Sequence, residues 1–145
     1  MPPPSNPPTT VIGCDVGKAH IHIHDSRTRR TSVINNDPSH IATFSRQLDA
    51  TCLVVCEATG GYEHALLTAM LKAAIPCHRA DGNRVKAFLR SLGSMAKTDR
   101  IDAAGLAAYG RERHATLTRW KPLDGTRDQV GQLVRTRLDR VATRA

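Results

Sequence analysis

Four acidic residues stand where their surroundings give them a common chemistry. Asp15 lies near the end of the apolar run TVIGCDV, Glu57 ends the apolar run TCLVVCE, and Asp99 and Asp102 lie three residues apart further on. Neighbouring buried carboxylates repel one another and lose hydration. A divalent cation relieves both costs, and oxygen ligands suit Mg²⁺ or Mn²⁺. Since such ions promote phosphoryl transfer, these four acids are our candidate catalytic and metal-ligating residues.

Each of these acids also has an ordinary structural role open to it. Asp15 could form the turn that follows it, and Glu57 could cap the next helix or pair with an arginine. Asp99 would be favourable in the first turn of any helix, because the helix dipole attracts negative charge there. Asp102 could be an exposed partner of Arg100. Spacing alone does not decide between these roles and metal binding.

Basic side chains are concentrated in the second half of the chain. The 145 residues include 21 Lys and Arg against 13 Asp and Glu, a net charge of +8. Residues 1–78 hold six of each sign, whereas residues 79–145 hold 15 basic and seven acidic side chains. This asymmetry is typical of proteins that bind a polyanion, although a solvated helix surface is the alternative. The candidate nucleic-acid-binding residues are Lys18, Arg84, Lys86, Arg90, Lys97 and Arg100.

Apolar periodicity predicts the elements that would position these residues. The segment HIHIH alternates strictly, as a half-buried strand does, and TCLVVCE is apolar enough for a buried central strand. Three antiparallel strands and then alternating helices and strands predict a ribonuclease H-like α/β fold, with functional groups at strand ends. We expect strands at residues 10–16, 20–24, 30–35, 51–57 and 75–79, and helices at residues 39–49, 62–74 and 83–92.

Two further helices are expected late in the chain. Thr98 is a favourable N-cap for a helix over residues 99–109. This helix would place Asp99 and Asp102 on one face, with Cβ atoms about 5 to 6 Å apart. Residues 128–145 carry a stripe of apolar side chains and predict a helix that extends from the domain. Because its own segment cannot bury the stripe, this helix should lead into a longer protein or pair with another chain.

Smaller features have weaker chemical interpretations. The four cysteines lie in apolar segments and are expected to be buried hydrophobes rather than zinc ligands. The histidines of HIHIH share a strand face and are expected to meet solvent or RNA rather than a metal. The turn Thr59–Gly61 could present backbone amides to a phosphate, although glycine turns are common. Five aromatic residues are too few for base stacking to dominate nucleic-acid binding.

Length and composition bound the class of protein. With 145 residues and 40% hydrophobic side chains, the chain can form one core but not two catalytic domains. No run is apolar enough to cross a bilayer and the first residues lack a secretory signal, so a cytoplasmic protein is expected. We expect a Pro-rich tail over residues 1–8, one domain over residues 9–115, and a linker with the start of a helical segment over residues 116–145.

Three segments in order resemble a known family. VIGCDVGKAH, VVCEATGGYEHAL and MAKTDRIDAAGLA look like the N-terminal RuvC-like domain of DEDD insertion-sequence transposases related to the Piv/MooV invertases. This group includes recombinases guided by a bridge RNA. The resemblance covers about residues 10–114. It implies that Asp15, Glu57, Asp99 and Asp102 form the family's acidic tetrad, bind Mg²⁺ and act in DNA strand cleavage and exchange.

The resemblance further implies DNA, a guide RNA and other copies of the chain, in a dimer or tetramer, as partners. Family members carry a second, C-terminal transposase domain with a nucleophilic serine. Nothing in this sequence corresponds to that domain, since Ser91 and Ser94 lie outside any matching motif, and the isolated chain is expected to be inactive without it.

Two other hypotheses come from the residues themselves. The basic last segment favours a non-catalytic module for RNA binding and oligomerisation. The Asp-x-Gly of DVGK is typical of actin-like ATPases and sugar kinases. Those proteins need a second phosphate-binding half, for which the chain is too short.

Overall fold

The structure is a computed structural model, and it describes residues 7–93 and 100–122. Nine elements are found in this part of the chain, and none of its helices is long and apolar enough to cross a membrane. The strands are β1 (Thr10–Val16), β2 (His20–Asp25), β3 (Thr31–Asn35), β4 (Cys52–Glu57) and β5 (Cys77–Ala80). The helices are α1 (Pro38–Ser45), α2 (His64–Lys72), α3 (Gly82–Ser91) and α4 (Ala103–Arg113).

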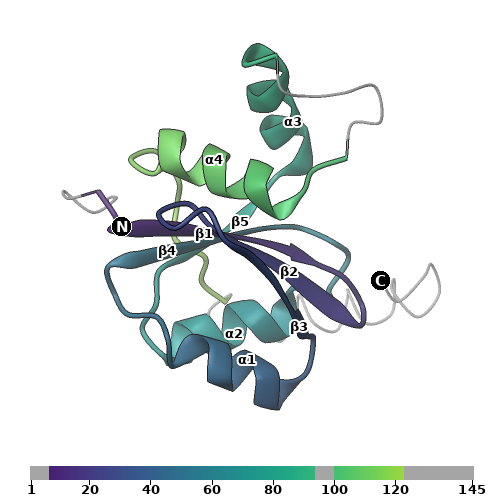
Figure 1. The fold of residues 1–145 in the computed structure, drawn as a ribbon, viewed down its shortest axis with the longest axis vertical. Helices are drawn as coiled ribbons and strands as arrows, with labels where there is room; N and C mark the ends of the chain where they lie inside the picture. Colours follow the sequence, from purple (N-terminus) through teal and green to yellow (C-terminus); the bar gives the residue numbers. More distant parts are fainter. Residues whose placement is uncertain (1–6, 94–99, 123–145) are drawn as a thin grey trace.

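The five strands form one mixed sheet in the order β3-β2-β1-β4-β5. β1 and β3 are antiparallel to β2, whereas β4 is parallel to both of its neighbours, β1 and β5. Figure 1 shows α1 and α2 on one face of the sheet and α3 and α4 on the other. The predicted mixed sheet between helices is therefore confirmed. Because β1 and β4 are parallel, their carboxyl ends meet at the same edge of the sheet.

Alternation along the strands divides the core into two layers. Cys14 packs on the side of α1 and α2, together with Val54 and Cys56 of β4. Val11 packs on the side of α3 and α4. Because successive side chains of a strand point to opposite faces, Asp15 projects to the side of α3 and α4.

Small residues let α4 lie directly on β1. A Cβ added to Gly13 would overlap the carbonyl oxygen of Ala103 and come within 2.6 Å of the Ala107 nitrogen. A Cβ added to Gly110 would come within 2.7 Å of valine methyl groups of β1 and β4. The helix and strand backbones therefore touch at Gly13, which fixes where the first residues of α4 lie relative to β1.

The segment after α4 covers the edge of the sheet at β5. The side chain of Leu117 is buried with the apolar residues of α3 and α4. The Trp120 N–H donates to the Cys77 carbonyl at 2.7 Å, and His78 Nδ1 donates to the Thr118 carbonyl at 2.7 Å. The first bond occupies a backbone carbonyl that an exposed edge strand would leave open, and the second ties a β5 side chain to the covering segment.

Most predicted elements are confirmed within two residues at each end. The main difference among the first eight is α1, which ends at Ser45 rather than at residue 49. The N–H groups of Gln47 and Leu48 bond to carbonyls three residues back, so the chain leaves the helix in a tight turn. The expected helix over residues 128–145 lies outside the described residues.

The prediction for the start and end of α4 was wrong. The helix begins at Ala103, with Asp102 as its N-cap in extended conformation, and it continues through Gly110 to Arg113. Gly110 does not end the helix because it packs where no Cβ fits. Asp102 therefore precedes the helix and cannot share a helix face with Asp99, which lies outside the described residues together with Thr98.

Candidate metal and nucleic-acid site

Asp15 and Glu57 are brought together by strand register. Cys14 of β1 is the partner of Cys56 of β4, and the two acids are the next residues of these parallel strands. Both acids project to the opposite face from the cysteines, on the side of α3 and α4. Adjacent strands are about 4.8 Å apart, so the two carboxyl groups are neighbours at the carboxyl end of the sheet. The site expected from the sequence requires these two strands to be neighbours, and β1 and β4 are.

The carboxylate of Glu57 lies against the start of α3. A Cβ on Gly82, the first residue of α3, would overlap Glu57 Oε2, so the absence of a side chain there makes room for the carboxylate. Burial raises the pKa of Glu57 above its usual value; the ammonium of Lys86 opposes the shift, whereas Asp15 and Asp81 add to it. Burial is thus the main cause of the raised pKa of Glu57, and the two neighbouring acids add smaller contributions.

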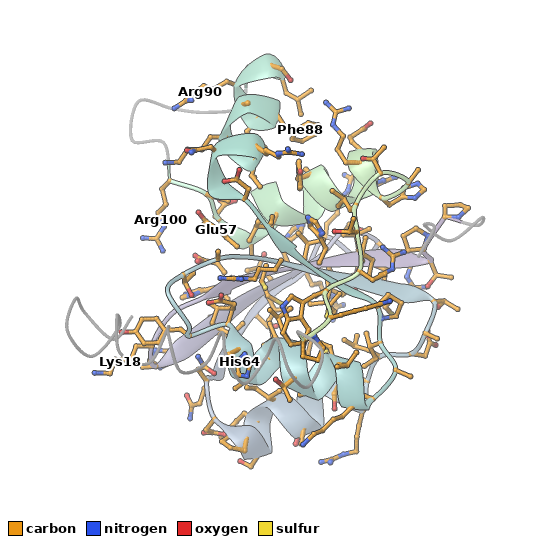
Figure 2. The ribbon with its side chains drawn as sticks, turned by 180° about the vertical axis from the view of Figure 1, so that it is seen from behind. Lys18, Glu57, His64, Phe88, Arg90 and Arg100 are labelled. Atoms are coloured by element: carbon orange, nitrogen blue, oxygen red, sulfur yellow. The ribbon has the colours of Figure 1, made fainter. Side chains whose placement is uncertain are left out.

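The carboxylate of Asp15 is partly shielded by an arginine. Arg100 Nη2 donates to Asp15 Oδ2 at 3.2 Å, while 76% of the Arg100 side chain remains exposed. An exposed pair of this kind contributes little to stability, so this guanidinium is easily displaced from Asp15. Figure 2 shows Arg100 and Glu57 on the same side of the molecule. The pairing of Asp15 with an arginine was not predicted.

Asp102 lies at the same end of β1 but serves as a helix cap. Its Oδ1 accepts the Gly105 N–H at 2.8 Å. The residue that follows it, Ala103, contacts Gly13, which is two residues before Asp15. Asp102 is therefore near the other two acids in the fold, with one oxygen engaged in capping α4.

The acids are neighbours without forming a closed ligand cage. Among residues 7–93 and 100–122, no three His, Cys, Asp or Glu side chains stand together in a way that would hold a metal ion. The donors fit a divalent cation in kind, because all are carboxylate oxygens and because Asp15 raises the pKa of Glu57. A cation placed there would offset the repulsion between Asp15 and Glu57, which is a smaller cause of this shift than burial.

The basic candidates lie around this end of the molecule. Lys18 is exposed in the turn between β1 and β2, Arg84 and Arg90 are exposed on α3, and Lys86 is half-buried near Glu57. Figure 2 shows Lys18, Arg90 and Arg100 on the same side as Glu57. Positive side chains therefore flank the acids on two elements. Lys97 lies outside the described residues.

Glu63 shapes the loop after Glu57, and the sequence analysis missed it. Only 2% of the residue is exposed. Its Oε1 accepts from the Thr59 N–H at 3.1 Å, the Thr59 hydroxyl at 2.7 Å and the Gly61 N–H at 3.1 Å. Its Oε2 accepts from Arg79 Nε at 2.8 Å. These amides belong to the turn that the sequence analysis considered as a phosphate site. Because they bond to Glu63, they are not free to bind a phosphate.

Asn36 ties two loops of the site together and was also missed. Its Nδ2 donates to the Gly17 carbonyl at 2.8 Å and to the Tyr62 carbonyl at 3.2 Å. The first carbonyl follows β1 and the second follows β4, so one side chain spans the ends of both acid-bearing strands. The only feature of the sequence that could have pointed to Asn36 is its position directly after the third predicted strand.

The remaining chemical candidates have structural roles. All four cysteines are free and buried, and burial raises the pKa of Cys77 to about 11, as expected for packing residues. His22 is exposed on β2 opposite Asp15, and His24 Nδ1 lies 2.9 Å from the Thr31 hydroxyl. The histidine row thus lies on the sheet face that carries the acids.

Comparison with solved structures identifies the fold. RuvC of Thermus thermophilus matches with a TM-score of 0.55 and 15% sequence identity, over 77% of this chain and 100% of that chain. The same organism's RuvC in complex with a Holliday junction substrate matches with a TM-score of 0.54 and 15% identity, over 77% and 99%. At this identity the matches show the fold alone. They confirm the predicted ribonuclease H-like class.

Comparison with protein families gives a second, independent result. No curated protein sequence matches the chain. Residues 12–145 match the family model DEDD_Tnp_IS110, which is described as a transposase. This match includes all three segments on which the sequence resemblance rests, apart from the first residue of VIGCDVGKAH. The chain therefore belongs to the DEDD transposase family of the IS110 type.

Proposed function

We propose that this domain performs metal-dependent DNA strand cleavage and exchange within a transposase. One observation carries the proposal: Asp15 and Glu57 share one face at the carboxyl ends of two parallel strands, where the start of α4 brings Asp102. Functional groups of α/β sheets gather at such ends. Membership of a transposase family and a RuvC-like fold support the same conclusion.

The residues that would hold the cation are the four acids predicted from the sequence, Asp15, Glu57, Asp99 and Asp102. When bound, Mg²⁺ or Mn²⁺ would supply activation of a nucleophile and neutralisation of charge on the leaving oxygen. The protein's own contribution is to hold the acids close together. Gly82 leaves room for Glu57, and Asn36 and Glu63 fix the loops beside it.

Nucleic acid would lie across the basic residues around the acids. Lys18 follows Asp15 by three residues along the chain, Arg100 contacts Asp15 in space, and Lys86 is near Glu57. Guanidinium and ammonium groups bind phosphate oxygens, which positions a strand without reading its sequence. The ion pair between Arg100 and Asp15 is exposed, so Arg100 can leave Asp15 and bind a phosphate instead. The candidates on α3 and in the loop before α4 are Arg84, Arg90 and Lys97.

The DNA partner is supported by the relative that was solved with a Holliday junction substrate. A guide RNA and a dimer or tetramer of the chain belong to the proposal through the sequence resemblance. We further propose that the protein acts in the cytoplasm and that its RuvC-like domain spans about residues 9–115.

The test is strand cleavage by the full-length protein in Mg²⁺ or Mn²⁺, comparing wild type with the D15N/D102N double variant. Asparagine is also a good N-cap, so Asp102→Asn keeps α4 intact. We expect cleavage to fall by at least about 100-fold, since the charge of two ligands is lost. The exposed acid on α4 gives a matched control, Glu112→Gln, which should retain wild-type cleavage. Undiminished cleavage by the double variant contradicts the proposal.

A non-catalytic RNA-binding module is the second candidate. It is favoured because Asp15 pairs with Arg100 and Asp102 caps α4, which are structural roles. That candidate predicts RNA binding with a steep salt dependence and no strand cleavage under any metal condition. The cleavage assay separates the two functions.

A further inference from the structure

A basic cavity lies at the opposite end of β1 from the acids. It has a volume of about 470 Å³ and is formed by the start of β1, the turn between β2 and β3, and the end of α4. Val11 lines it, and four residues separate Val11 from Asp15 along an extended strand, about 13 Å at 3.3 Å per residue. The cavity is therefore distinct from the proposed metal site.

Three arginines from two elements converge on this cavity. Arg27 and Arg29 come from the turn between β2 and β3, and Arg111 comes from the last turn of α4. In the part of the chain that the structure describes, neither Arg29 nor Arg111 makes an ion pair. Like charges gathered this closely repel unless an anion lies among them. A guanidinium also matches the geometry of phosphate oxygens better than an ammonium does.

A carboxylate beside the cavity, that of Asp25, is engaged in the turn through one of its oxygens. Asp25 Oδ1 accepts from the Thr10 hydroxyl at 2.6 Å and from the N–H groups of Arg27 and Thr28 at 2.8 and 3.3 Å. Although burial acts in the opposite direction, these bonds and the charge of Arg27 hold the pKa of Asp25 below its usual value. Asp25 thus offsets part of one arginine's charge and leaves the cavity with a positive excess.

His114 is a further residue of the cavity wall, and its ring can report on binding there. It lines the cavity at the end of α4, and its Nδ1 is buried without a hydrogen-bond partner among the residues described. Buried polar atoms of native proteins are bonded in about nine cases of ten. Within the described residues, it is the one buried side-chain nitrogen or oxygen left in this state. Because this nitrogen is closed off from solvent, a ligand in the open cavity can reach it only if the ring turns.

The turn that carries the arginines is held in a fixed shape. Arg29 has a φ of 61°, a left-handed backbone conformation that is uncommon for residues other than glycine. The Val11 N–H donates to the Ser26 hydroxyl at 3.0 Å, and the Ser26 N–H donates to the Val11 carbonyl at 2.9 Å. Local strain that is held by such bonds is typical of ligand sites. The arginines are therefore positioned before any ligand arrives.

We propose that this cavity binds a phosphate group of a nucleic-acid backbone. Pockets of 300–1,000 Å³ hold small organic ligands, so one phosphodiester with its attached sugar fits the volume. The assignment of nucleic acid as the source rests on the proposed function, whereas phosphate binding itself rests only on the cavity. The domain would then grip its nucleic acid at two separated places, one beside the acids and one at the far end of β1.

The test compares two double variants with the same loss of charge on the same two elements. R27Q/R111Q removes two arginines that line the cavity. R30Q/R113Q removes one arginine of the same turn and one of α4, where Arg113 lies over the Phe88 ring, 5.1 Å from its centroid, and neither lines the cavity. Binding of a labelled single-stranded 12-mer is measured by fluorescence anisotropy over a series of salt concentrations.

We expect R27Q/R111Q to weaken binding about tenfold and to flatten the salt dependence by one to two counterions. The R30Q/R113Q control should change affinity less than threefold. Equal effects of the two double variants would overturn the proposal, because they would reflect net charge alone. Thermal unfolding of each variant confirms that it is folded.

A second measurement follows the His114 ring by NMR in the wild-type protein. Titration with the 12-mer should shift its resonances at lower concentration than titration with inorganic phosphate or with AMP. Equal response to AMP would confirm a phosphate site but contradict a nucleic-acid backbone as its natural occupant, and no response to any of the three would overturn the site. The two proposals can fail separately. If R27Q/R111Q loses 12-mer binding while D15N/D102N retains cleavage, the result contradicts only the proposed function.

Discussion

The carbonyl oxygen of Ala103 rests against Gly13 so closely that no Cβ could fit between them. This contact joins a strand and a helix that are far apart in the sequence. Asp15 lies two residues after the glycine and Asp102 lies one residue before the alanine. The contact therefore brings acids from both ends of the domain to the same edge of the sheet.

Gly13→Ala should destabilise the domain by about 2 to 3 kcal/mol, because an added methyl group forces two backbones apart. Urea unfolding measures the loss. Gly17→Ala is the matched control, since its added Cβ would meet the His20 carbonyl at an ordinary 3.4 Å and should change stability by less than about 1 kcal/mol. Equal stabilities of the two variants would show that α4 does not depend on this contact.

Glu63→Gln should lower the free energy of unfolding by about 2 kcal/mol at pH 7, because bonds from Thr59, Gly61 and Arg79 lose a charged acceptor. Glu112→Gln, an exposed change on α4, should cost less than about 0.5 kcal/mol. A cost of E63Q no larger than that of E112Q would mean that the loop holds itself without the glutamate.

The pH dependence of stability gives Glu63 a second test. Although burial acts the other way, the bonds from Thr59 and the charge of Arg79 hold the pKa of Glu63 below its usual value. The native state therefore binds fewer protons than the unfolded state as pH falls below about 4.3, so the stabilisation present above that pH is lost in acid. Wild-type protein should lose more stability than E63Q between pH 5 and pH 3 in urea titrations. A parallel decline in the two proteins would contradict this assignment.

Arg100→Gln should have opposite effects on two ligands. Removing the guanidinium beside Asp15 should strengthen Mn²⁺ binding by about threefold and weaken oligonucleotide binding by about threefold. Stability should change by less than 1 kcal/mol, because the pair is exposed. Arg46→Gln at the C-cap of α1, in the opposite layer, should leave both affinities unchanged. A change in the same direction for both ligands would remove Arg100 from the site.

Gly82→Ala should separate activity from stability. The new methyl group would overlap Glu57 Oε2, and the flexible carboxylate would move aside at little cost while alanine favours the helix. We expect cleavage to fall by at least about tenfold with stability unchanged within 1 kcal/mol. Asn83→Ala, one residue further along the same helical turn, should retain cleavage. Full activity of G82A would show that the position of Glu57 does not matter.

The sequence was sufficient for the sheet but not for the details of the site. Strict alternation in HIHIH and the continuous apolar run before Glu57 predicted strands because burial patterns follow strand geometry directly. Asp15 and Glu57 could be placed at strand ends for the same reason, whereas the pairing of β1 with β4 is known only from the structure. Such patterns report which face of an element is buried, and they do not report how elements pack on one another.

The start of α4 shows this limit most clearly. Thr98 and Asp102 are both good N-caps, and local preference does not choose between them. The choice depends on Gly13 and Gly110, whose missing side chains allow the helix to lie on β1 in one register. Glu63 was missed because an acid at the start of a helix is common and gives no sign of a special role. Its bonds to Thr59, Gly61 and Arg79 are visible only in the folded loop.

The most direct test of the account is Mn²⁺ binding, measured by EPR titration of the full-length wild-type protein and its D15N/E57Q double variant. If the two carboxylates share a cation, the double variant should bind Mn²⁺ at least about tenfold more weakly and lose DNA cleavage, with its fold intact by circular dichroism. Equal Mn²⁺ affinity and equal cleavage in the two proteins would contradict the claim that these strand ends form the catalytic centre.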